Sequence, residues 1–157
     1  MSHPLYVAFI WHQHQPLYKS RDRVTTSSSQ YRLPWVRLHG TKDYLDLVLI
    51  LERYPKLHQT VNLVPSLILQ LEDYVAGTAF DPYLTVSLTP TEQLKREQKQ
   101  FIIANFFDAN HHTLIDPHPR YADLYHQRQE RGAAWCLENW QERDYSDLLA
   151  WHNLAWI

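Results

Sequence analysis

The chain of 157 residues has little glycine, cysteine or net charge, and each shortage argues against a class of function. Its 3 glycines form neither a phosphate-cradling loop nor a G-x-S-x-G nucleophile motif. The single cysteine, Cys136, cannot form an internal disulfide, which favours a reducing compartment. A formal charge of −2 provides no excess of basic groups, which argues against a nucleic-acid partner.

Long hydrophobic runs are also missing. The apolar run over residues 5–11 is too short to cross a bilayer. The residues before it lack the basic region and the cleavage site of a secretion signal. We therefore expect a soluble, cytoplasmic protein with no membrane partner. Its 45% hydrophobic and 20% charged residues are typical of a globular domain.

Aromatic residues and histidines, in contrast, are abundant, with 6 Trp, 10 Tyr and 10 His. The usual interpretation of such aromatic residues is that they build a core or an interface. A second interpretation is that some of them stack against the C–H faces of sugar rings.

The first half of the chain predicts an α/β fold. Residues 5–11 are rich in β-forming apolar residues, which is typical of a strand buried on both faces of a parallel sheet. A second strand is expected over residues 59–63. The pattern predicts one helix that begins at an N-cap, Thr41, and another that starts at Pro65 and ends at Gly77. This alternation predicts a parallel sheet with right-handed crossovers.

The second half is expected to be mainly helical, with residues 78–145 forming an insertion within the same domain. Residues 89–92 resemble a capping box that opens a helix, Gly132 ends another helix, and a last helix is expected to start near Ser146. The polar segment 19–30 is expected to be an exposed loop. Two strands are far short of a closed (β/α) barrel, which needs about 200 residues or more, so we expect an incomplete domain.

Two histidines stand two residues apart after the first expected strand. Because alternate side chains of a strand point the same way, His12 and His14 should face one side of the carboxyl edge, where α/β proteins concentrate ligand groups. Their nitrogens can hydrogen-bond sugar hydroxyls, with Gln15 adding an amide. Alternatively, both rings can bind zinc, which needs a further ligand. Candidates for that ligand are His111, His112, His118, His126 and His152.

Five further residues are candidates for the same rim. Asn62 lies near the end of the second strand, and Trp35, Arg37 and His39 precede the first expected helix on what should be the same face. Trp11 can stack on a sugar, although a tryptophan at the end of a buried strand is more often part of the core. We find no convincing pair of carboxylates at strand ends, which glycoside hydrolysis would need.

Four stretches resemble glycoside hydrolase family 57. Residues 11–16, Trp-His-Gln-His-Gln-Pro, look like its first signature, whose core is His-Gln-Pro at the end of the first barrel strand. Residues 33–44, 60–67 and 151–156 resemble the family in the same order.

The resemblance implies the first β/α units of a distorted seven-stranded (β/α) barrel. It also implies a retaining glycoside hydrolase or glucanotransferase that acts on α-1,4 or α-1,6 linkages of an α-glucan or maltooligosaccharide and needs no cofactor. By that resemblance, His14 lines the sugar subsite with His12 beside it.

The family's nucleophilic Glu and acid Asp belong to later signatures that are not recognisable here. The chain alone should therefore supply part of a sugar-binding wall and no catalytic residue. Its expected partners are the rest of the barrel, or a second copy bound through exposed sheet edges. Two alternatives remain: a zinc-dependent hydrolase or deacetylase with His12 and His14 as ligands, and a non-catalytic carbohydrate-binding module.

Overall fold

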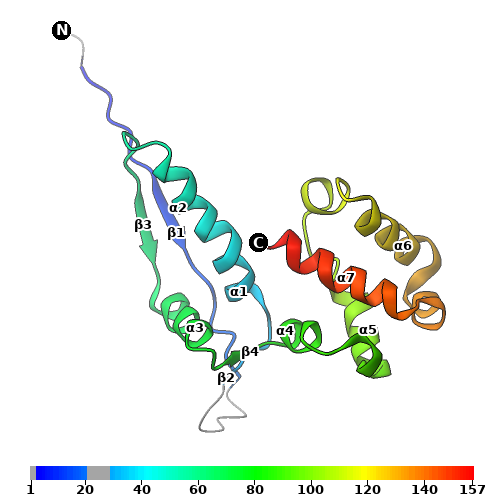
Figure 1. Ribbon diagram of the computed structural model, residues 1–157. Coiled ribbons are helices and arrows are strands. Elements are labelled where there is room, and N and C mark those ends of the chain that lie inside the picture. The colour runs from blue at the N-terminus through cyan, green and yellow to red at the C-terminus, as the bar shows by residue number, and fades with distance from the viewer. Residues whose placement is uncertain (1–2, 21–28) are drawn as a thin grey trace. The chain divides into compact units, whose positions relative to one another are not determined.

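The computed structural model describes residues 3–20 and 29–157 and divides the chain into two compact units, Met1–Phe80 and Asp81–Ile157 (Figure 1). We call them unit 1 and unit 2 and describe each by itself. Most of the loop expected over 19–30 lies outside the described residues. The boundary falls close to the start of the helical segment expected over 78–145.

Unit 1 contains both strands and helices. In chain order they are β1 Ile10–Gln13, β2 Ser29–Gln30, α1 Trp35–His39, the π-helical turn η1 Gly40–Tyr44, α2 Leu45–Glu52, β3 Thr60–Leu63, α3 Pro65–Val75 and β4 Ala79–Phe80. Strands β1 and β3 pair in parallel, with His12 opposite Asn62, and β2 pairs in parallel with β4. The expected parallel β/α order is therefore confirmed.

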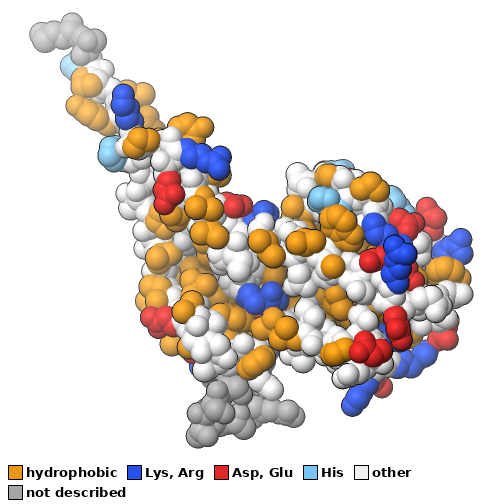
Figure 2. Space-filling view, in the orientation of Figure 1, with side chains coloured by type: hydrophobic (Ala, Val, Ile, Leu, Met, Phe, Trp, Pro, Cys, Tyr) orange, Lys and Arg blue, Asp and Glu red, His pale blue; other side chains and the backbone are white. Residues whose placement is uncertain are grey.

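The expectation of a first strand buried on both faces is wrong. Strand β1 begins only at Ile10, and its side chains are exposed or half-buried, as are those of Leu5 and Tyr6 before it. Figure 2 shows hydrophobic side chains spread over the visible surface of unit 1. Burial on both faces requires covering layers on both sides of a wider sheet. The described part of unit 1 provides only two-stranded pairs.

The first helix also begins earlier than expected. Helix α1 starts at Trp35, directly after Pro34, and continues through η1 into α2. Thr41 is therefore not an N-cap. Its hydroxyl lies inside the helical segment and donates to the carbonyl oxygens of Arg37 at 3.1 Å and Leu38 at 3.2 Å. A threonine hydroxyl can bond the preceding helical turn in this way, so its presence alone does not mark a helix start.

The helix after the second strand agrees with the prediction. Helix α3 has Pro65 in its first turn, and Gly77 follows its end with a φ of 69°. This left-handed backbone conformation is costly for residues with a Cβ atom, so glycine suits the position.

Unit 2 is helical among its described residues. Its elements are α4 Pro82–Ser87, the 3₁₀ turn η2 Thr91–Gln93, α5 Arg96–Asn105, the π-helical turn η3 His111–Ile115, α6 Pro119–Asn139 and α7 Glu142–Ala155. The core combines aliphatic and aromatic side chains, including Phe106, and it contains Cys136, which is fully buried as expected. His152 is fully buried as well, with its ring centroid 4.6 Å from Phe106 and 5.8 Å from Tyr83.

Two helix starts in unit 2 differ from the prediction. Residues 89–92 do not open a long helix, because the turn η2 is followed by Leu94, whose backbone is extended and whose side chain is buried. The helix restarts at α5, where the Gln98 side-chain oxygen accepts from the Lys95 amide at 2.9 Å. The last helix begins at Glu142 rather than near Ser146. Gly132 does break α6, with φ 83°, but a further helical stretch follows it.

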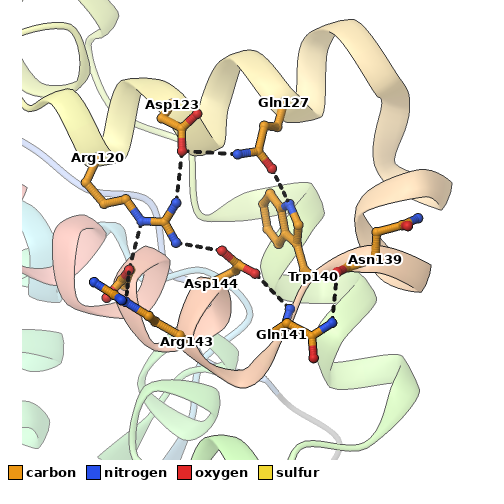
Figure 3. Close-up of polar contacts among 9 residues, drawn as sticks. Arg120, Asp123, Gln127, Asn139, Trp140, Gln141, Arg143 and Asp144 are labelled. Atoms are coloured by element: carbon orange, nitrogen blue, oxygen red, sulfur yellow. Dashed lines mark hydrogen bonds and ion pairs between the residues drawn. The ribbon is translucent and has the colours of Figure 1, made fainter.

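One guanidinium joins the two longest helices of unit 2 (Figure 3). Arg120 on α6 contacts Asp144 at 2.6 Å and Asp147 at 2.8 Å, both on α7, and Asp123 on its own helix at 2.9 Å. Asp144 also accepts from the Gln141 amide at 2.7 Å and so caps α7. The same carboxylate therefore caps the N-terminus of α7 and connects that helix to α6.

We expect Arg120→Ala to lower the free energy of unfolding of unit 2 by about 1–2 kcal/mol, since it removes charge-assisted hydrogen bonds from a half-buried position. Urea denaturation followed by circular dichroism measures the change. Arg143→Ala is the control, because Arg143 is 88% exposed and has one contact of 3.6 Å to Asp147. An equal loss in both variants would contradict a special role for Arg120.

Tyr145 gives a prediction about alkaline pH. Its side chain is fully buried, and its hydroxyl has no hydrogen-bond partner among the described residues. Burial, together with nearby Cys136, raises the pKa of Tyr145 to about 12. Because the unfolded chain loses this proton near pH 10 and the folded one does not, stability should fall between about pH 10 and pH 12.

Tyr145→Phe should leave the melting temperature at pH 7 unchanged or slightly higher, because it removes a buried unpaired hydroxyl. It should also make the decrease in melting temperature between pH 9 and pH 11 smaller than in the unsubstituted chain. Thermal unfolding at both pH values tests this. A large loss of stability at pH 7 would mean that the hydroxyl is hydrogen-bonded in solution.

Candidate sugar-binding site

Two neighbouring strands bring three of the predicted residues together. The rings of His12 and His14 stack with centroids 5.7 Å apart and planes 19° apart. His12 Nδ1 lies 3.0 Å from the Asn62 side-chain oxygen, across the register of β1 and β3. The group therefore stands at the carboxyl ends of adjacent parallel strands, where α/β proteins place ligand-binding side chains.

Trp11 does not join this group. It precedes His12 on β1, and consecutive side chains of a strand point to opposite faces. Its side chain is 50% exposed, so it is not a core residue within this structure either.

Gln15 lies beneath the surface rather than on it. It is buried, its side-chain oxygen accepts from the Tyr18 hydroxyl at 3.0 Å, and its nitrogen donates to the Tyr44 hydroxyl at 3.2 Å. Burial, together with the neighbouring Tyr44, raises the pKa of the Tyr18 hydroxyl. Gln15 thus connects the chain after β1 to η1.

The chain that follows the histidines is held by two side chains of α3. Pro16 has no N–H group and therefore cannot donate to a sheet ladder. The amide of Gln70 donates to the Pro16 carbonyl at 2.9 Å and accepts from the Tyr18 amide at 2.8 Å. The Ser66 hydroxyl donates to the Gln15 carbonyl at 2.9 Å. Gln70 is fully buried, so these bonds replace the ladder bonds that the chain has lost.

A carboxylate one turn further along α3 extends this attachment. Asp73 accepts from Lys19 at 2.9 Å and from the Tyr31 hydroxyl at 2.5 Å. Burial and the Asp73 carboxylate raise the pKa of Tyr31. Lys19 and Tyr31 form an antiparallel bridge, so Asp73 of α3 contacts both residues of that bridge.

The three candidates before the expected helix lie within α1 instead. Trp35 and His39 are one turn apart, with ring centroids separated by 6.0 Å. Arg37 stands midway between them in sequence, and helical spacing turns it to another side of α1. The expectation of one common face for all three is therefore wrong. His39 Nδ1 is hydrogen-bonded to the Asp43 carboxylate.

The described residues do not complete a metal site around the histidine pair. Among residues 3–20 and 29–157, no three His, Cys, Asp or Glu side chains lie together in a way that could hold a metal ion. His152, one of the candidate zinc ligands, packs against aromatic rings in unit 2.

The comparison with known families shows the family of this chain. Residues 8–157 match the family model for glycosyl hydrolase family 57. The chain belongs to this family. No curated protein and no solved structure matches it.

Membership of family 57 indicates a glycoside hydrolase or transferase acting on glucans and implies a (β/α) barrel fold. The parallel strands of unit 1 agree with the first part of such a fold. In the part of the chain that the structure describes, no helix is both long and apolar enough to cross a bilayer.

Sequence reasoning missed the residues that support the histidines in this family 57 chain. Helix α3 buries Leu67 and Gln70, whereas the apolar side chain of Ile68 is 39% exposed. Gln70 is a polar residue on the side of α3 that faces the core, and that position in the helical pattern could have indicated a special role. Nothing in the local pattern indicates its bonds to the Pro16 carbonyl and the Tyr18 amide, because these groups lie more than fifty positions away.

We expect Gln70→Ala to lower the free energy of unfolding of unit 1 by about 3 kcal/mol, because the Pro16 carbonyl and the Tyr18 amide lose their partner. Gln70→Glu should also destabilise, since its carboxylate would face the carbonyl oxygens of Pro16 and Ser66. Glu72→Gln, an exposed change on the same helix, is the control. Hydrogen exchange at the Tyr18 amide gives a local readout, and unchanged protection there would contradict the assignment.

Proposed function

We propose that this chain forms part of the sugar-binding wall of a retaining α-glucan-active family 57 enzyme. The observation that carries the proposal is the stacked pair His12 and His14, with Asn62 beside His12, at the carboxyl ends of two parallel strands. Their nitrogen and oxygen atoms are the groups that hydrogen-bond sugar hydroxyls. The linkage would be α-1,4 or α-1,6, and the product would arise by hydrolysis or by transfer.

The residues of the proposed sugar-binding wall have two roles: some would contact the sugar, and others would support the contact residues. His12, His14 and Asn62 would contact the sugar, and Trp35 and His39 on α1 would extend the contact surface. Gln15 would support them from below, because both ends of its amide are bonded to tyrosines. Trp11 and Arg37 point to other sides of their elements and would lie outside the immediate contact.

The catalytic carboxylates would come from outside the strands described here. Strands β1 and β3, with sequences IWHQ and TVNL, contain neither Asp nor Glu. A retaining mechanism needs a nucleophilic carboxylate and an acid carboxyl about 5–5.5 Å apart. The nucleophile would form a glycosyl-enzyme, which water resolves in hydrolysis and a sugar hydroxyl resolves in transfer. The histidine wall would hold the sugar next to the broken bond more tightly in the transition state than in the ground state.

The exposed apolar surface of unit 1 supports the proposal that further barrel elements cover it. Large hydrophobic side chains such as Val48 on α2 and Val61 on β3 are at least 40% exposed. An open surface of this kind is typical of an interaction face or of a sheet edge that pairs with further strands.

Titration with maltoheptaose tests the sugar-binding proposal. We expect the imidazole nitrogen resonances of His12 and His14 to shift on addition of maltoheptaose, and not on addition of the β-linked cellohexaose. His14→Ala should weaken binding about tenfold or more, because it removes a hydrogen bond to a hydroxyl and a stacked ring. His112→Ala is the matched control, since the His112 side chain is 92% exposed in unit 2.

Activity provides the second part of this test. In the protein as its own cells produce it, His14→Ala should lower kcat/KM for α-glucan while the unfolding transition stays where it was. Turnover equal to that of the unsubstituted enzyme would exclude the assigned role of His14. Proton spectra of the first product anomer would show whether the configuration is retained.

A further inference from the structure

The π-helical turn η1 places two side chains next to His39. His39 stands directly before this turn, and Asp43 and Tyr44 lie within it. His39 Nδ1 is hydrogen-bonded to the carboxylate of Asp43, four residues later in the chain. The centroid of the His39 ring lies 6.3 Å from that of Tyr44, five residues later. A π-turn is wider than an α-turn, so it brings the fifth residue onto the same side.

The turn is held against the rest of unit 1 at two points. A Cβ atom on Gly40 would lie 3.0 Å from Leu71 Cδ2, so the start of η1 approaches α3 closely. The Tyr44 hydroxyl accepts a hydrogen bond from Gln15, the residue after His14. The surroundings of His39 are therefore linked to the chain that carries the stacked histidines.

The Asp43 carboxylate determines where the His39 proton lies. An ionised carboxylate only accepts hydrogen bonds, so Nδ1 of His39 must be the donor. In the neutral ring, Nε2 is then the acceptor nitrogen. The same reasoning applies to His12, where the Asn62 side-chain oxygen lies 3.0 Å from Nδ1. The two rings thus share one tautomer, and in each case an oxygen of a neighbouring residue selects it.

We propose that Asp43 is a positioning residue: it keeps the proton of His39 on Nδ1, so that Nε2 accepts a hydrogen bond from a hydroxyl of the bound glucan. This inference rests on the proposed function, because it assigns His39 to the same sugar-binding wall. It adds a residue that does not itself contact the sugar. Loss of the carboxylate would release the His39 ring between its two tautomers and rotamers.

The first experiment determines the tautomer without any sugar. The ring nitrogens of ¹⁵N-histidine-labelled chain are recorded at a pH at which the spectrum shows neutral rings. We expect His39 of the unsubstituted chain to carry its proton on Nδ1, and Asp43→Asn and Asp43→Ala to shift the population toward Nε2–H. Asp46→Asn is the matched control, because Asp46 lies on α2 and pairs with Lys42 at 3.5 Å with similar exposure.

The second experiment measures maltoheptaose affinity for the same set of variants. We expect Asp43→Ala to weaken binding about fivefold to tenfold, as for one lost hydrogen bond, and Asp46→Asn to bind like the unsubstituted chain. Asp43→Asn should have the intermediate effect, since its amide can still offer an oxygen to Nδ1.

The outcomes separate the two proposals. If His39 of the unsubstituted chain is Nε2–H, or if neither Asp43 variant changes its tautomer, the inference about Asp43 is wrong. If the tautomer changes but the affinity equals that of Asp46→Asn, Asp43 positions the ring for no glucan contact and the inference is also overturned. If the unsubstituted chain shows no shift at His12 and His14 with maltoheptaose, the proposed function fails, and the inference that rests on it fails with it.

Discussion

The buried amide of Gln70 is the interaction on which the arrangement of unit 1 depends. His14, Gln15 and Pro16 follow strand β1, and their backbone groups do not continue the sheet. Gln70 meets the Pro16 carbonyl and the Tyr18 amide, and Ser66 meets the Gln15 carbonyl. Because helix α3 follows directly after β3, it connects the ends of both strands. His12, His14 and Asn62 are thereby held at one edge by groups that do not themselves face a ligand.

A second set of contacts attaches the helical segment before β3 to the same edge. Gln15 donates to Tyr44, and the π-turn that contains Tyr44 also brings Asp43 to His39. An oxygen of a neighbouring residue thus lies within hydrogen-bond distance of Nδ1 in both His12 and His39. Such rings have a defined donor and acceptor direction, which is useful for recognising a sugar hydroxyl because a hydroxyl can act in either role.

Unit 2 is stabilised by different means. Its core is rich in aromatic rings, and the ion-paired Arg120 joins α6 to α7 through carboxylates on both helices. His152 belongs to this core. Histidines therefore occupy two different environments: His12 and His14 lie at the strand ends of unit 1, and His152 packs against Phe106 and Tyr83.

The amino-acid sequence was enough to predict the family, the parallel β/α order, the helix that begins at Pro65 and the nearness of His12, His14 and Asn62. These follow from short motifs, from the period of a strand and from chain order, which are local properties. It did not determine the exposure of β1, the helix start at Trp35 or the direction of Arg37. Those depend on which layers and turns surround a segment.

The supporting residues are recognisable in the folded chain and not in the sequence. Gln70, Tyr44 and Asp43 act through partners elsewhere in the fold or through a π-turn that ordinary helical spacing does not indicate. A buried polar side chain is stabilised by the particular groups that it meets, and those groups are brought to it by the fold rather than by its own neighbours in sequence.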